Sequence, residues 1–109
     1  MGTVYFTSDL HMDHTNIIKY CNRPFIDGKS MTEQLIMNWN SQVAVNDLVI
    51  ILGDFLWRKN YERLNEVTNR LNGKKILVRG NHDFFSDDEY LNAGFSRVCN
   101  LLEINILRI

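Results

Sequence analysis

Residues 48–54, Leu-Val-Ile-Ile-Leu-Gly-Asp, place five consecutive apolar residues directly before a glycine and a carboxylate. A short, uniformly apolar run is typical of a strand buried on both faces, and such strands usually belong to parallel sheets. Two further segments have the composition of strands: residues 4–8, rich in aromatic and β-branched side chains, and residues 75–78, Lys-Ile-Leu-Val. The sequence therefore predicts three strands, and the segments between them decide how the strands connect.

Apolar residues recur at helical spacing between these strands. We expect a short helix at 16–20 and a longer one that starts with a capping box at 30–33 and ends near residue 46. A third helix is expected at 61–71, with Gly73 after its end. A fourth should start with a second capping box at 86–89 and end at Gly94. The alternating segment 102–106 is predicted to be a further strand. This order predicts an α/β fold over residues 1–109, one βαβαβ domain with a mostly parallel sheet and right-handed crossovers.

Bulk composition narrows the function classes. The 109 residues carry a formal net charge of -1, so charge does not indicate a nucleic-acid partner. Two isolated cysteines indicate buried thiols in a reducing compartment. The first residues do not have the pattern of a secretory signal, and no stretch approaches the about 20 apolar residues that span a bilayer. We therefore expect a cytoplasmic protein with no membrane partner.

Three polar clusters directly follow the predicted strands: Asp9-Leu10-His11, Gly53-Asp54 and Gly80-Asn81-His82-Asp83. Ligands of open α/β sheets bind outside the carboxyl ends of the strands, so the clusters are expected to meet at one edge. Each cluster alone has a simpler interpretation, as a helix cap or a turn. Their occurrence together, each at a strand end, favours a common site.

The residue types in these clusters suit a divalent metal. Residues two apart in an extended chain point to the same side, so Asp9 and His11 are expected to approach one ion together. Carboxylate and imidazole ligands suit Zn²⁺, Mn²⁺ or Fe. Asp54 offers a carboxylate able to bridge two ions, and Asn81 offers a neutral carbonyl oxygen.

The order D-x-H, G-D, G-N-H-D resembles the signature of the calcineurin-like metallophosphoesterases. Thr7-Ser8-Asp9-Leu10-His11, His14 and the segment from Tyr20 to Phe25 resemble the small bacterial and phage members. The resemblance implies a metal-dependent phosphoesterase that hydrolyses a phosphomonoester or phosphodiester by attack of a metal-bound hydroxide. It also implies the N-terminal half of that family's α/β sandwich.

The resemblance assigns a role to each matching residue. Asp9 and His11 would bind the first ion, Asp54 would bridge two ions, and Asn81 would bind the second. His82 would act as proton donor or transition-state stabiliser at the leaving-group oxygen. Asp83 would lie behind the site and orient the His82 ring. The ligand types are compatible with Mn, Fe, Zn, Ni or Mg.

Three residues near the first cluster have open interpretations. Asp13 stands where family members of this kind usually have glycine, and we expect it to cap the helix at 16–20. His14 is either a contact to substrate phosphate or a surface histidine. Arg23 is either an anion contact or an exposed loop arginine.

The later metal ligands of the family have no counterpart in this sequence, because none of its three histidines lies beyond His82. We therefore expect a C-terminally incomplete domain with a weak second metal site. An uncovered sheet face would favour association into a homo-oligomer. The alternative function is a metallophosphoesterase-like module, weakly active or inactive, that binds a metal, a nucleotide or a protein.

Overall fold

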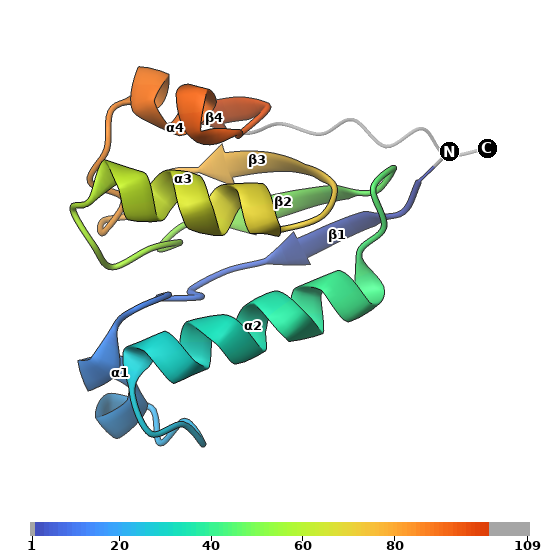
Figure 1. The fold of residues 1–109 in the computed structure, drawn as a ribbon. Coiled ribbons are helices and arrows are strands. Elements are labelled where there is room, and N and C mark those ends of the chain that lie inside the picture. Colours follow the sequence, from blue (N-terminus) through green and yellow to red (C-terminus); the bar gives the residue numbers. More distant parts are fainter. Residues whose placement is uncertain (1, 101–109) are drawn as a thin grey trace.

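The computed structural model describes residues 2–100. Its centre is a four-stranded sheet in the order β1-β2-β3-β4, and every neighbouring pair is parallel (Figure 1). The strands are β1 (Val4–Thr7), β2 (Leu48–Leu52), β3 (Lys74–Val78) and β4 (Arg97–Cys99). The predicted α/β class with a parallel sheet is confirmed.

Helices form all the crossovers between strands. α1 (Thr15–Tyr20) and α2 (Gly28–Gln42) connect β1 to β2, α3 (Tyr61–Arg70) connects β2 to β3, and α4 (Asp87–Ala93) connects β3 to β4. Right-handed crossovers between strands added in sequential order place successive helices on the same face of a sheet. The carboxyl ends of all four strands consequently open toward one edge, where the loops into the helices begin.

The core lies between the sheet and these helices. β2 contributes Val49 and Ile51 and β3 contributes Leu77, while α3 contributes Leu64 and Val67. The complete buried cluster is Met12, Ile36, Trp39, Val43, Val49, Ile51, Phe55, Leu56, Leu64, Val67, Leu71, Leu77, Phe85, Tyr90, Ala93 and Phe95. Met12, Phe55 and Leu56 lie beyond the strand ends, so the loops that follow β1 and β2 are anchored in the core.

The opposite face of the sheet is more exposed. Phe6 retains 59% of its accessible surface, and Val4 and Leu52 retain about as much. Phe6 pairs in register with Ile50, and Leu52 stands two residues further along β2, so these side chains share one face. The pairing of two copies through this face stays a prediction.

Both ends of α2 differ from the predicted boundaries by several residues or by the capping residue. α2 begins at Gly28 because the Asp27 side chain accepts a hydrogen bond from the Ser30 backbone N–H, so the expected cap at Ser30 lies inside the helix. It ends at Gln42 rather than near residue 46. The second capping box is confirmed, since Ser86 and Glu89 exchange both hydrogen bonds at the start of α4.

One strand was missed. β4 has only three residues and pairs with β3 through Arg97, Val98 and Cys99. The strand predicted at 102–106 lies outside the described residues. None of the helices within residues 2–100 combines the length and the apolar character that a membrane crossing requires.

Candidate metal centre

The loops after β1 and β2 run side by side beyond the ends of their strands. The backbone N–H of Asp9 donates to the Gly53 carbonyl at 3.1 Å, and that of His11 donates to the Asp54 carbonyl at 3.0 Å. Met12 continues the pattern by donating to Phe55 and accepting from the Trp57 N–H at 2.8 Å. Backbone pairing therefore brings the first two sequence clusters together.

Asp9, His11 and Asp54 form the candidate metal group. Their ligand atoms all lie within 4.8 Å of one another. All three residues have left-handed backbones, with φ of 54°, 49° and 55°. The two side chains of the first loop thus converge through turned backbone, not through the extended chain that the sequence suggested. Left-handed backbone is costly for residues other than glycine and concentrates at functional sites.

The donor set fits a divalent ion. Two carboxylates and one imidazole are the oxygen and nitrogen ligands preferred by Zn²⁺, Mn²⁺ or Fe. His11 Nε2 lies 3.7 Å from Asp54 Oδ2, too far for a hydrogen bond, so these two atoms do not satisfy each other. Burial lowers the pKa of His11, against the opposing charge of Asp54, and so favours the neutral imidazole that binds metals.

His14 lies directly behind His11. The Nδ1 atoms of the two rings are 3.2 Å apart, so one donates to the other. Burial, followed by the charges of His11 and His82, lowers the pKa of His14 and favours a neutral pair in which this hydrogen bond forms. A metal-binding histidine commonly uses its second ring nitrogen in this way. His14 is 9% exposed, so the surface-histidine interpretation is wrong.

Gly53 and Gly80 allow the third cluster to reach the other two. A Cβ on Gly80 would lie 2.7 Å from Asp54 Oδ1, and one on Gly53 would lie 3.1 Å from the Gly80 Cα. Gly53 also has a φ of +86°. This close approach lets the His82 backbone N–H donate to Asp54 Oδ1 at 3.0 Å. Asn81 occupies the exposed turn immediately before His82.

Asp83 joins two of the loops. Its buried carboxylate accepts backbone N–H groups from Asp54 at 2.9 Å, Phe55 at 3.0 Å and Gly80 at 2.7 Å. The sequence placed Asp83 behind the site, and it lies there. Its oxygens, however, hold the backbone of the loops rather than the His82 ring.

Arg23 fastens the first loop from outside. Its guanidinium donates to the carbonyl oxygens of Leu10 at 2.9 Å and Asp9 at 2.8 Å. These contacts pair both terminal nitrogens with the two successive carbonyls on either side of Leu10. Neither open interpretation, an anion contact or an exposed loop arginine, describes this role.

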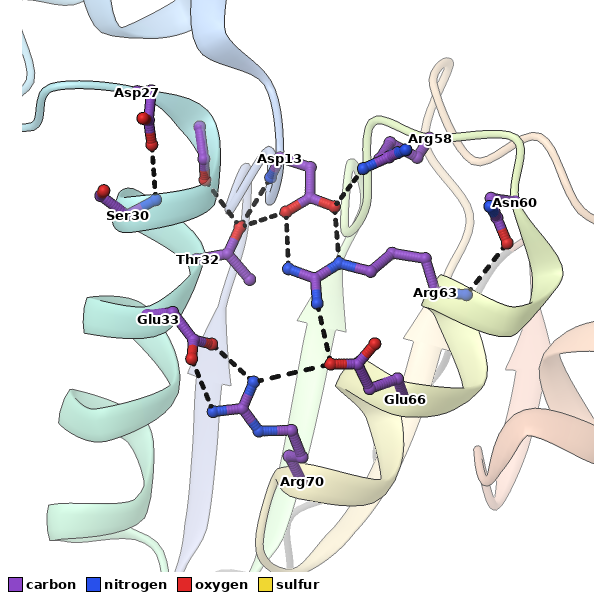
Figure 2. Close-up of polar contacts among 11 residues, drawn as sticks. Asp13, Asp27, Ser30, Thr32, Glu33, Arg58, Asn60, Arg63, Glu66 and Arg70 are labelled. Carbon is purple, nitrogen blue, oxygen red and sulfur yellow. Dashed lines mark hydrogen bonds and ion pairs between the residues drawn. The ribbon is translucent and has the colours of Figure 1, made fainter.

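Asp13 forms a buried polar junction between α2 and α3 (Figure 2). Arg63 donates to both of its carboxylate oxygens, through Nε at 2.7 Å and Nη2 at 2.9 Å. The Thr32 hydroxyl lies 2.8 Å from the carboxylate and accepts the Asp13 backbone N–H at 2.7 Å. The expected helix cap is wrong, because His14 is the N-cap residue of α1 and no side chain caps that end.

This junction stabilises a loop that carries two of the candidate ligands. Burial raises the pKa of Asp13, but hydrogen bonds from Arg63 and Thr32 and the charge of Arg63 outweigh burial and hold it below its ordinary value. The network continues outward from Arg63 to Glu66, and Arg70 contacts both Glu66 and Glu33 (Figure 2). Asp13 therefore stays ionised and paired at neutral pH.

Sequence reasoning gave no role to Arg63, Thr32 or Trp57. Arg63 and Asp13 are 50 residues apart, and an arginine in the first turn of a helix carries no local signal of a buried partner. The one clue was Asp13 itself, a carboxylate where the resembling family usually has glycine.

The sequence of the chain is similar to those of known proteins. The family model for calcineurin-like phosphoesterases matches residues 2–105. The uncharacterized protein MJ1445 of Methanocaldococcus jannaschii is 46% identical over 88 residues, which cover 80% of this chain and 50% of that protein. The gene 66 protein of Mycobacterium phage D29 is 37% identical over 86 residues, covering 76% and 41%.

One solved structure has a similar fold. The protein of unknown function AQ665 from Aquifex aeolicus superposes with a TM-score of 0.74 at 31% identity. The match covers 95% of this chain and 55% of that one. The chain thus spans about half the length of the relatives it matches.

Proposed function

The chain belongs to the calcineurin-like phosphoesterase family, and from this premise we propose that it is a divalent-metal-dependent phosphoesterase acting on a phosphomonoester or phosphodiester. The observation that carries the proposal is the convergence of Asp9, His11 and Asp54 within 4.8 Å at the carboxyl edge of the sheet. A bound divalent ion would supply Lewis acidity toward the phosphate and lower the pKa of a coordinated water.

The residues have distinct tasks in this proposal. Asp9, His11 and Asp54 would hold the first ion, and Asp54 with Asn81 would hold a second, weaker one. His82 lies beside this group, since its ring centroid is 6.2 Å from that of His11. From there its imidazole donates a proton to the leaving oxygen or stabilises the negative charge that develops.

A second candidate function is metal binding without turnover. It is favoured by the small number of residues proposed for the second ion, which are Asp54 and Asn81. A site with few protein ligands and little supporting structure binds its ion weakly. In this case the chain would bind one ion and a phosphate ester but would not hydrolyse it.

The test measures metal binding and turnover separately. Mn²⁺ affinity is measured by titration calorimetry, and hydrolysis of p-nitrophenyl phosphate and bis-p-nitrophenyl phosphate is followed with Mn²⁺ present. The variant is Asp54→Asn, which keeps the side-chain shape and removes one charge. The matched control is Asp88→Asn on the exposed first turn of α4.

Metal-dependent turnover that is lost in Asp54→Asn and kept in Asp88→Asn would support the phosphoesterase. A folded protein that binds Mn²⁺ through Asp54 but hydrolyses neither substrate would favour the binding function. Absence of Mn²⁺ binding at millimolar concentration would sink both candidates.

A further inference from the structure

All three histidines of the chain gather around one indole, that of Trp57. His14 stacks on it, with centroids 3.9 Å apart and an interplanar angle of 7°. His82 meets it edge to face at 4.5 Å and 61°, and His11 lies at 6.0 Å. Trp57 lies outside the buried apolar core, and its aromatic neighbours are the three histidines and Phe84.

The His82 ring depends on aromatic packing for its orientation. The backbone N–H of His82 donates to the Asp54 carboxylate. Within residues 2–100, no protein hydrogen bond reaches the ring nitrogens of His82. The ring instead packs against Trp57 and against Phe84, whose centroid is 6.1 Å away at 64°. A partly exposed ring on a turn would otherwise exchange among its rotamers.

Trp57 is itself held on two sides. Its backbone N–H donates to the Met12 carbonyl at 2.8 Å, and Met12 and Leu56 form a parallel bridge that joins the two loops. Its indole rests on the buried ring of His14, which is hydrogen-bonded to His11. The indole therefore makes a parallel stack with His14 on one side and an edge-to-face contact with His82 on another.

We infer that Trp57 is a positioning residue whose indole holds the His82 imidazole at the leaving-group side of the metal group. The inference rests on the proposed phosphoesterase function. It assigns to Trp57 no contact with the phosphate and no metal ligation. Loss of the indole should therefore impair the proton donation by His82 while metal binding stays intact.

The first experiment uses leaving groups that differ in their need for a proton. p-Nitrophenolate departs without protonation, whereas the phenolate of phenyl phosphate benefits from a general acid, whose typical contribution is about 10²–10⁴-fold. Trp57→Leu should lower kcat on phenyl phosphate by about tenfold or more and on p-nitrophenyl phosphate by less than about threefold. KM and Mn²⁺ affinity should stay near the wild-type values.

Two comparisons make the result specific. In a His82→Ala background Trp57→Leu should have little further effect, because residues that act together are non-additive. The control is Tyr61→Leu, which removes another partly exposed aromatic ring; Tyr61 packs on Phe85 and not on a histidine. Equal losses on both leaving groups, or additive losses with His82→Ala, would overturn the inference.

The second experiment needs neither metal nor turnover. The ¹H–¹³C spectra of the histidine Cε1–Hε1 groups report the ring current of the indole and the mobility of each imidazole. Trp57→Leu should shift the His14 and His82 signals and increase the motion of the His82 ring, and Tyr61→Leu should do neither. Trp57→Phe, a milder change, should give smaller shifts in the same direction.

The two experiments separate failure of the inference from failure of the proposed function. If wild-type protein lacks turnover with Mn²⁺, the function fails, and the spectra still decide whether Trp57 holds His82. An unchanged His82 signal and unchanged ring mobility in both Trp57 variants would overturn the inference whatever the activity.

Discussion

Removing the charge of Asp13 should destabilise the fold strongly. Asp13→Asn keeps the size of the side chain and tolerates the left-handed backbone at φ 66°, so the change is mainly electrostatic. It leaves Arg63 charged inside the protein, because the two side chains are only 4% and 9% exposed. Breaking a buried pair by removing one partner typically costs about 3–5 kcal/mol.

The structure places the expected loss at the lower end of that range. Arg63 keeps a hydrogen bond to Glu66 at 3.1 Å, and asparagine keeps one oxygen as an acceptor. We therefore expect a loss of about 3 kcal/mol out of a total near 5–15 kcal/mol. With a urea slope of about 1–3 kcal/mol per molar, the unfolding midpoint should fall by about 1–3 M.

Urea unfolding followed by tryptophan fluorescence and circular dichroism measures this loss. Glu33→Gln is the matched control in the same network, because Glu33 and Arg70 are 50% and 38% exposed. An exposed pair contributes about 0.2–1 kcal/mol, so the control should cost several times less. Adding Arg63→Met to Asp13→Asn should recover part of the loss, since no buried charge then remains unpaired.

The same pair predicts a dependence on acid. Because the pKa of Asp13 lies below its ordinary value in the folded protein, its stabilisation is present above the ordinary value and is lost as pH falls through the folded one. The Asp13→Asn variant should lack this part of the acid response. A loss no larger than that of Glu33→Gln at pH 7 would refute the reasoning.

Two further changes test the packing of the loops and of the core. Gly80→Ala places a Cβ 2.7 Å from Asp54 Oδ1, so Mn²⁺ affinity measured by calorimetry should fall by about tenfold or more, a change of about 1.4 kcal/mol; unchanged affinity would contradict the close approach. Burial, and then the nearby charge of Asp83, raises the pKa of Tyr90 from 10.0 to about 12. The phenol of the unfolded chain therefore ionises at a lower pH than that of the folded protein. The free energy of unfolding should then fall between about pH 10 and 12 by at most about 2.7 kcal/mol, and a Tyr90→Phe variant with the same fall would refute this assignment.

The elements that the sequence predicts best carry their signal within themselves. The apolar run at 48–52 became β2 with the same limits, and the capping box at Ser86 began α4. β4 was missed because three residues are too few to show an alternating pattern. The start of α2 was missed because Asp27 and Ser30 both have capping chemistry, and backbone geometry decided between them.

The sequence likewise predicts the candidate ligands of the site but not the side chains that support them. Asp9, His11 and Asp54 were found because each follows a strand of a parallel sheet, where position in the chain determines position in space. The side chains that hold these residues in place come from distant segments: Arg63 from α3 and Trp57 from the loop before it. Their roles depend on contacts between residues 25 to 50 positions apart, which no local pattern contains.

The left-handed backbone at Asp9, His11 and Asp54 lowers the stability of the fold, although the proposed metal site needs these three side chains. Each such residue costs about 1–3 kcal/mol of conformational strain that glycine would largely relieve. A library of variants selected only for resistance to heat or protease should therefore enrich glycine at these positions. The variants that survive best in such a selection would be those that have lost the metal group.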